Sequence, residues 1–372
     1  MTDLLVVGAG PAGRGLAHRA LAAGHHVTLI DPDPDTPWTA TLGLFTDDLP
    51  GWLDADAVVA ARSPVVTIYT PGRRDIDRGY AVLDAAALHR TLDVTGAKLE
   101  RQRVTELTAR TATLDDGRTL RGDVVIDARG GRAVGDVVRQ TAWGVVSTRA
   151  PSSPGSTNGM ANADMVLMDW RSTPEKSPSF VYRVDVGHGA ELIEETCLAG
   201  RPAPDPQELG ARLGRPAADG RPELVDFPLT AGRHPWKQAD DAPLRFGAAG
   251  GLMNPATGYS IAASLNAADV LVAAISEGTC PRRALWPRGA RSVYRIRLIG
   301  LGVLLGLDGS QLTAFFDAFF RLPAPAQRAY LSSRDDVAGT LSTMWSVFRR
   351  LPLRLQGRVI GLTVRSAVRP PA

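Results

Sequence analysis

The chain of 372 residues is poor in cysteine, with Cys197 and Cys280 as its only two. Two cysteines cannot build the disulfide framework of a small secreted domain, and their spacing excludes a CxxC motif. No basic segment precedes the first apolar run, so we also expect no signal peptide. These absences favour a globular protein of a reducing compartment, long enough for two domains and a large buried core.

The C-terminal part lacks both lysine and a long hydrophobic run. From residue 281 onward there are fifteen Arg and four acidic residues, a net charge of +11 against −8 for the rest of the chain. The longest apolar run there, residues 298–307, has ten residues, whereas a membrane-spanning helix needs about 20. We expect peripheral attachment to an anionic membrane surface, on its cytoplasmic side, and no binding of nucleic acid. A solvated helical cap with Arg on its outer face is the alternative.

The start of the chain combines an apolar run, residues 4–7, with a glycine-rich turn and a helical pattern. Gly8 permits the tight turn, Gly10 lets the backbone approach a pyrophosphate, and Gly13 lets the helix close on the strand. Asp31 ends the next apolar run, where a carboxylate accepts hydrogen bonds from a ribose. This unit predicts a dinucleotide site, and its expected contacts are Gly8, Gly10, Pro11, Ala12, Gly13 and Asp31.

The glycines alone do not distinguish FAD from NAD, but no second copy of the fingerprint follows, which favours one resident cofactor. We expect no metal site. Two later segments are expected to approach the cofactor. One is a short apolar strand that ends at Asp127, and the other runs from residue 244 into Gly247 and Gly250. Both place a strand end beside glycines, as nucleotide-binding loops do.

The fold class predicted from these patterns is α/β, with a Rossmann-like domain interrupted by an antiparallel sheet. From residue 139 the chain reads as longer strands with aromatic residues, over residues 141–148, 164–170, 179–186 and 190–199. Residues 200–224 read as loop and short helix. We therefore expect a discontinuous dinucleotide-binding domain, a substrate-binding sheet and a C-terminal helical region, over residues 1–138 with 241–280, 139–240 and 281–372.

The strand at residues 190–199 carries two neighbouring carboxylates. Because side chains alternate along a strand, Glu194 and Glu195 point to opposite faces, and both faces are otherwise apolar. A buried carboxylate must be paired, hydrogen-bonded or protonated. Two interpretations are open for each glutamate. It could form an ion pair with Arg183 on the preceding strand, or it could have a catalytic role.

Several segments match the motifs of one enzyme family in the right order. They are Met168-Asp169-Trp170-Arg171, Pro178-Ser179-Phe180-Val181-Tyr182, Leu192-Ile193-Glu194-Glu195-Thr196, residues 247–259, Phe315-Phe316-Asp317-Ala318-Phe319-Phe320 and Leu331-Ser332-Ser333-Arg334. On these segments the chain resembles, over nearly its whole length, the flavin-dependent lycopene cyclases of plants and bacteria. The resemblance implies an FAD-binding fold of the flavin hydroxylase and glutathione reductase type, with Asn254 and Gly258 as further cofactor contacts.

The resemblance also implies the chemistry. A proton adds to the terminal alkene of lycopene or a related polyprenoid, the C5=C6 bond captures the cation, and a second proton leaves. FAD is required in its reduced form, with NADPH or another reductant as the electron source, although the net reaction is redox-neutral. Glu194 is then the expected proton donor, because burial keeps a carboxylic acid protonated near neutral pH. Glu195 is expected to support it, and Asp169 to orient the acid or accept the last proton, unless an ion pair with Arg171 holds it.

Aromatic side chains of the same sheet are candidates to bind the substrate and stabilise positive charge. They are Trp143, Trp170, Phe180 and Tyr182, although aromatic residues of this kind are more often plain core. A cyclase of another polyprenyl chain and a flavin-dependent monooxygenase or reductase are the alternatives. Ala248 stands where the related hydroxylases carry an acid, which favours a cyclase.

Overall fold

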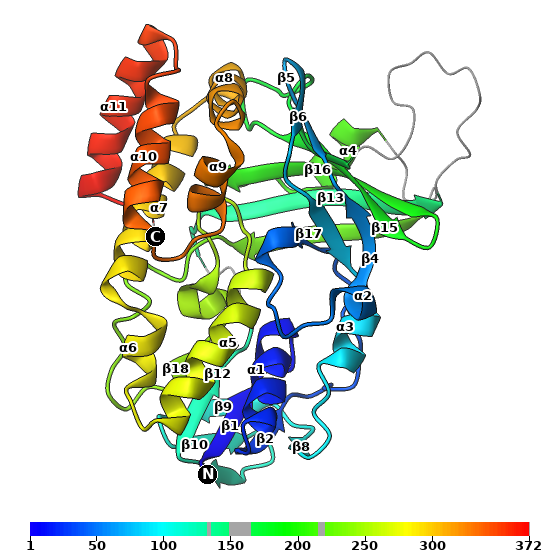
Figure 1. Ribbon diagram of the computed structural model, residues 1–372, viewed down its shortest axis with the longest axis vertical. Helices are drawn as coiled ribbons and strands as arrows, with labels where there is room; N and C mark the ends of the chain where they lie inside the picture. The colour runs from blue at the N-terminus through cyan, green and yellow to red at the C-terminus, as the bar shows by residue number, and fades with distance from the viewer. Residues whose placement is uncertain (132–134, 149–164, 215–219, 372) are drawn as a thin grey trace.

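The computed structural model describes residues 1–131, 135–148, 165–214 and 220–371. Within them, a parallel sheet forms the lower end of the molecule in Figure 1, a larger sheet forms the upper end, and helices cover one side of both. The mixture of helices and sheets is the α/β architecture predicted from the sequence.

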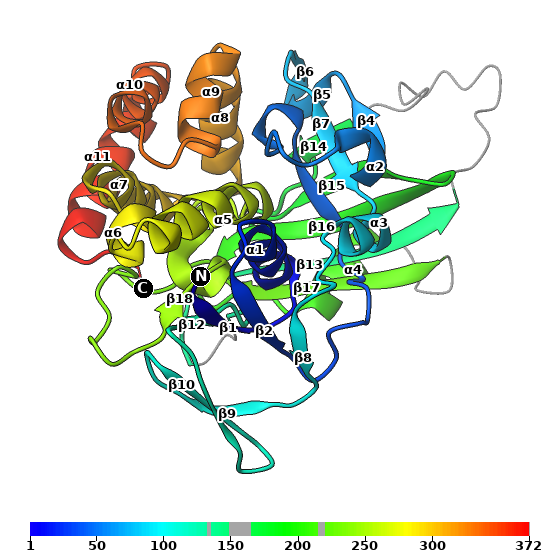
Figure 2. The same ribbon diagram turned by 60° about the horizontal axis from the view of Figure 1, so that its bottom comes forward.

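The parallel sheet has five strands in the order β18-β12-β1-β2-β8. Leu4 and Val6 of the central strand pack with helices α1 and α5, whereas Leu5 and Val7 pack against a small antiparallel sheet on the other face. Because both faces are buried, the strand reads as a continuous apolar run. Helices α1 and α5 lie side by side across the sheet (Figure 2). The bounds are β1 Asp3–Val7, β2 His26–Ile30, β8 Lys98–Glu100, β12 Val124–Asp127, β18 Leu244–Arg245, α1 Pro11–Ala22 and α5 Ile261–Ser276, with β9 Val104–Leu107, β10 Thr111–Leu114 and β11 Thr119–Arg121 in the small sheet.

The larger sheet has seven strands in the order β17-β13-β16-β15-β14-β5-β6. Neighbouring strands are antiparallel except for β14 and β5, which run parallel. Strands β13, β14, β15 and β16 were predicted from the sequence, and their bounds agree closely with that prediction. The bounds are β13 Arg139–Thr148, β14 Met165–Asp169, β15 Phe180–Gly187, β16 Ala190–Gly200, β17 Arg221–Pro228, β5 Val66–Thr70 and β6 Gly72–Ile76, with α4 Pro206–Leu213 packed on one face.

Three strands of this sheet differ from the expectation. Strands β5 and β6 lie within residues 1–138, which the sequence assigns to the dinucleotide-binding domain. Strand β5 nevertheless joins the larger sheet by pairing with β14. Strand β17 begins inside the segment expected to be loop. It is an edge strand, and its Pro222 and Pro228 are tolerated there because an edge leaves one side without ladder hydrogen bonds.

A third, three-stranded sheet, in the order β3-β7-β4, packs against β15 of the seven-stranded sheet and against helix α5. Its strands are β3 Leu42–Phe45, β4 Val59–Ser63 and β7 Tyr80–Leu83, and the short helices α2 Ala55–Val58 and α3 Ala85–Thr91 flank it. The side chain of Asp84 caps α3 by accepting a hydrogen bond from the Ala87 backbone amide.

The C-terminal region is helical, as the sequence predicted. Helix α8 starts at Gly309 behind a capping box formed by Asp308, and helices α9 and α11 start directly after Pro323 and Pro352. No helix in the described part of the chain is both long and apolar enough to cross a membrane. The bounds are α6 Pro281–Leu285, α7 Arg288–Leu304, α8 Gly309–Phe320, α9 Ala324–Leu331, α10 Val337–Phe348 and α11 Leu353–Val368.

Candidate active site

A cavity of about 680 Å³ lies where the two larger sheets and the C-terminal helices meet. Its wall combines the glycine-rich loop before α1, one face of the seven-stranded sheet and the aromatic face of α8. Residues that share this cavity therefore come from every part of the chain, and they include Gly10, Pro11, Ala12, Phe180, Tyr182, Glu194, Phe315, Phe316, Phe319 and Phe320.

The glycine-rich loop has the geometry of a phosphate cradle. Gly8 has a φ of +103°, and a Cβ on Gly13 would collide with the Gly8 carbonyl oxygen, so both positions need glycine. A Cβ on Gly10 would meet no protein atom within 4 Å, which leaves open space in front of the loop at the N-terminus of α1. Asp31 Oδ2 accepts a 2.8 Å hydrogen bond from the Ala9 amide and so fastens the loop. These residues fit the pyrophosphate and ribose of a dinucleotide.

The other predicted cofactor residues lie around the same loop. A Cβ on Gly247, whose φ is +72°, would come 2.9 Å from the Ala12 side chain, so glycine lets this turn approach α1. Gly250 packs equally closely on the carbonyl of Arg245. Asp127 ends β12 beside β1, but its carboxylate is held by two 2.9 Å hydrogen bonds from Arg129.

The segment at residues 254–258 divides into a structural and a cavity-lining part. Gly258 lines the cavity with a φ of +78°, where a Cβ would collide with Gln140. Asn254 is buried and donates to the carbonyls of Tyr330 (3.3 Å) and Leu331 (3.1 Å), so it ties this segment to helix α9.

Glu194 is the carboxylate of β16 that faces the cavity. Its side chain is only 7% exposed, and its Oε1 accepts a 2.6 Å hydrogen bond from the hydroxyl of Thr196. Burial, assisted by the negative charge of Glu223, raises the pKa of Glu194 to about 7. The group is therefore a carboxylic acid through much of the range below neutral pH.

Glu195 lies on the opposite face, together with two other predicted site residues. The register aligns it with Trp143 and, through Val181, with Asp169, and none of these three side chains lines the cavity. Helix α4 covers this face, and Trp143 packs against its Gly210. Burial raises the pKa of Glu195, while its hydrogen bond with Ser179 opposes the rise.

Asp169 forms an ion pair with Arg171, which was one of the two roles expected for it from the sequence. Arg171 donates to its two oxygens at 2.9 and 2.6 Å, and the guanidinium lies 3.8 Å from the centre of the Tyr69 ring. The ion pair of Arg183 with Glu194 or Glu195, one of the two interpretations from the sequence, is not formed; Arg183 pairs with Glu191. It stands opposite Ile193 and donates diagonally to Glu191 at 2.6 Å.

The predicted aromatic residues have different places. Phe180 and Tyr182 line the cavity, whereas Trp170 lies behind it, stacked on Phe316 at 5.0 Å and tilted against Phe180 at 4.9 Å. Trp170 thus fixes the rings that form the wall.

Three polar residues of the cavity, Glu223, Tyr80 and Tyr259, were not predicted as site residues from the sequence. Glu223 lies on the unexpected strand β17 and is 7% exposed. Tyr80 is hydrogen-bonded to both Tyr182 and Tyr259, and all three phenols line the cavity. Glu223 was missed because Pro222 and Pro228 argue against a strand over residues 221–228.

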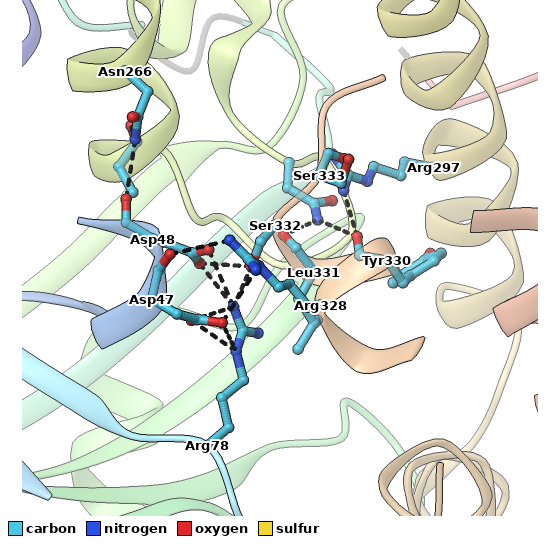
Figure 3. Close-up of polar contacts among 12 residues, drawn as sticks. Asp47, Asp48, Arg78, Asn266, Arg297, Arg328, Tyr330, Leu331, Ser332 and Ser333 are labelled. Carbon is cyan, nitrogen blue, oxygen red and sulfur yellow. Dashed lines mark hydrogen bonds and ion pairs between the residues drawn. The ribbon is translucent and has the colours of Figure 1, made fainter. Parts of the chain in front are cut away.

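A second, polar cavity of about 490 Å³ lies behind Tyr259 and Leu331, which border both spaces. Beside it, Arg78 donates to Asp47 at 2.8 Å, to Asp48 at 3.1 Å and to the Ser332 hydroxyl at 2.7 Å (Figure 3). This cluster joins the β3–β7 region to the end of helix α9.

A buried arginine completes the connection from the side of helix α7. Arg297 donates to the carbonyls of Tyr330 and Ser333 at 2.5 and 2.6 Å (Figure 3), and burial lowers its pKa to about 10. The C-terminal segment that lines the active-site cavity is therefore anchored on both sides.

Comparison with known proteins gives a consistent result. A family model described as "Lycopene cyclase protein" matches residues 3–356. The chain is 34% identical, over its whole length, to a protein of Deinococcus radiodurans named "Uncharacterized carotenoid cyclase", of which 95% is covered. It is 27% identical over 95% of its length to a lycopene beta cyclase of Synechococcus elongatus, of which 94% is covered.

Solved structures show the same fold at low sequence identity. A geranylgeranyl bacteriochlorophyll reductase-like protein of Thermoplasma acidophilum matches with a TM-score of 0.64 and 16% identity, over 97% of this chain and 99% of that one. PqsL of Pseudomonas aeruginosa, a probable FAD-dependent monooxygenase, matches with a TM-score of 0.53 and 14% identity, over 92% and 99%. These likenesses confirm the predicted fold type.

Proposed function

The chain belongs to the lycopene cyclase family, and we propose that it closes the acyclic ends of lycopene into β-ionone rings with FAD bound. The observation that carries this proposal is the position of Glu194. It is a buried acid that opens into the same cavity as the phosphate loop, among aromatic side chains. In reaction class the protein would be an intramolecular lyase, because the product is an isomer of the substrate.

Glu194 would start the reaction by protonating the terminal alkene. An alkene is a poor base, so the acid must be neutral and shielded from water before the transfer. Thr196 donates to Oε1 and thereby orients the carboxyl group. Once the proton has left, the same hydrogen bond stabilises the carboxylate.

The walls of the cavity would bind the chain and protect the cation. Phe180, four phenylalanine rings of α8 and Tyr330 of α9 face the space, so the hydrocarbon would meet apolar surface and water would be kept out. The π faces of these rings attract positive charge. When FAD is bound in its reduced, anionic form, it would supply negative charge next to the cation. The phosphate loop, Asp31 and the turns at Gly247 and Gly258 are the parts that would hold it.

The experiment uses the purified protein with reduced FAD and lycopene under anaerobic conditions. We expect cyclized products of unchanged mass, whereas a monooxygenase would add the mass of oxygen and a reductase the mass of hydrogen. Glu194→Gln keeps the shape of the side chain, so it should retain FAD and lose turnover by a factor of about 10² to 10⁴ or more. Glu195→Gln, on the covered face, is the matched control and should turn over. Near wild-type turnover in Glu194→Gln would contradict the assignment.

Peripheral membrane attachment is supported by the outer faces of α10 and α11. Large apolar side chains are exposed there, including Trp345 (60%), Leu353 (83%) and Val364 (60%), interspersed with arginines. Such a surface combines burial in the interface with attraction to anionic lipid.

The attachment can be tested with liposomes. Binding to anionic vesicles should weaken as salt rises, because exposed charges are screened over about 8 Å at physiological ionic strength. Trp345→Ser should bind less, whereas Val270→Ser, which changes an exposed residue of α5, should bind like the wild type. Equal binding to neutral and anionic vesicles at every salt concentration would exclude the electrostatic contribution.

A further inference from the structure

The strand register places a second buried carboxylate beside Glu194. Gly144 of β13 stands opposite Glu194 on one side and opposite Glu223 of β17 on the other. Both glutamates are 7% exposed and both line the active-site cavity. Their backbones are two strands apart, about 10 Å, and the glycine between them contributes no side chain.

We propose that Glu223 is the base that accepts the proton leaving the new ring and returns it to Glu194. This role rests on the proposed cyclase function. It assigns the two proton transfers to two carboxylates on one face of the sheet, with the reacting end of the substrate above Gly144.

The proton balance of the reaction requires such a group. The O–H bond of Glu194 breaks as a C–H bond forms at the terminal alkene, and the C5=C6 electron pair forms the new C1–C6 bond. The C6–H bond then breaks, its electrons restore C5=C6, and the proton passes to the Glu223 carboxylate. Transfer from Glu223 to Glu194 restores the starting state, so no oxidant or reductant is consumed.

The surroundings of the two carboxylates differ in the way that an acid–base pair needs. Glu223 accepts hydrogen bonds from the Thr41 amide at 2.7 Å and hydroxyl at 2.8 Å, and Arg221 lies 3.4 Å away. These donors suit an ionised carboxylate. Glu194 instead faces Thr196 and the neutral phenols of Tyr80 and Tyr182.

The two groups also influence one another. The negative charge of Glu223 helps to raise the pKa of Glu194 to about 7, although burial contributes most. Like charges that share a site favour one neutral and one ionised group. In this proposal the proton for donation is therefore at Glu194, and the accepting oxygens are those of Glu223, which Thr41 and Arg221 hold in place.

Glu223→Gln tests the role, since the amide oxygen still accepts from Thr41 but the side chain takes up no proton. We expect turnover to fall by about 10² or more at every pH, with FAD retained. The infrared carbonyl signal of protonated Glu194 can be followed by titration without substrate and is identified by its loss in Glu194→Gln. In Glu223→Gln it should disappear at a lower pH than in the wild type, because the neighbouring negative charge is gone.

Thr41→Val separates this role from a structural one. It removes a hydroxyl donor to Glu223 but leaves the carboxylate, so its loss of turnover should be far smaller. If Glu223→Gln and Thr41→Val lose turnover equally and neither moves the Glu194 titration, Glu223 only fixes the Thr41 segment. Turnover of Glu223→Gln within about threefold of the wild type also overturns the role. The proposed function is tested separately, with the wild-type protein. If the wild type does not cyclize lycopene, the proposed function itself is overturned, whatever the variants do.

Discussion

The burial of Glu194 has a consequence for stability that can be measured without substrate. In the native state this carboxyl keeps its proton up to a pH of about 7, whereas in the unfolded chain it releases it near its ordinary pKa of 4.5. Between these two values the native state binds more protons than the unfolded state. The free energy of unfolding therefore falls as pH rises through this window, which is the reverse of the usual effect of a salt-bridged carboxylate.

The magnitude follows from the size of the window. A shift from 4.5 to about 7 corresponds to about 3 kcal/mol when the group is fully ionised, at about 1.4 kcal/mol per pH unit. Between pH 5.5 and 8.5 about 2 kcal/mol of this penalty develops. Glu194→Gln has no proton to lose, so its stability relative to the wild type should rise by that amount over the same interval.

The assay is the free energy of unfolding in urea at pH 5.5 and 8.5, with the same excess of FAD for both proteins. Other titrating groups are common to both and cancel in the difference. Glu208→Gln, which changes an exposed carboxylate of α4, is the control and should differ from the wild type by the same amount at both pH values. A pH-independent difference between Glu194→Gln and the wild type would refute the claim that Glu194 is protonated near neutral pH.

Three substitutions test the surroundings of the site. Gly10→Val adds a side chain where the structure has open space, so the fold should persist while the flavin absorbance is lost, and retention of FAD would contradict the phosphate cradle. Gly144→Ala puts a methyl group 3.0 Å from the Cβ of Glu194, which should reduce turnover at least tenfold with FAD still bound, as a product assay would show. Arg78→Met removes a buried guanidinium from the partly buried Asp48 and from the exposed Asp47, and should cost about 3 kcal/mol in urea unfolding. Arg101→Met, which breaks an exposed ion pair, should cost under about 1 kcal/mol.

The parts of the fold that the sequence predicts well are those with a strong local signal. The phosphate loop follows from three glycines with separate steric reasons, and the long strands β13 to β16 follow from their alternating apolar residues. Strands β5 and β6 form a hairpin that could belong to either sheet, and only the long-range pairing of β5 with β14 decides. Such non-local pairing leaves no mark on the local pattern.

The site shows the same division between local and non-local information. Alternation along β16 separates Glu194 from Glu195, but it does not say which face meets the cavity, since both are apolar. The assignment depends on α4, which covers the Glu195 face, and on α8, which helps to enclose the other. Charge complementarity suggested Arg183 as the partner of these acids, whereas a diagonal approach gives it to Glu191.

Gly144 shows how a residue without a side chain can determine the chemistry of a sheet. Any larger residue at this position would collide with Leu192 and crowd Glu194, so the cavity depends on its absence of a Cβ. The same gap leaves Glu194 and Glu223 facing one space from strands that do not touch. Because the two acids are separated by 29 positions in the sequence and by a glycine in the sheet, neither the alternation of β16 nor that of β17 reveals them as a pair. A cross-strand row of acid, glycine and acid on a buried face is therefore the feature that defines this site, and it becomes visible only when the register is known.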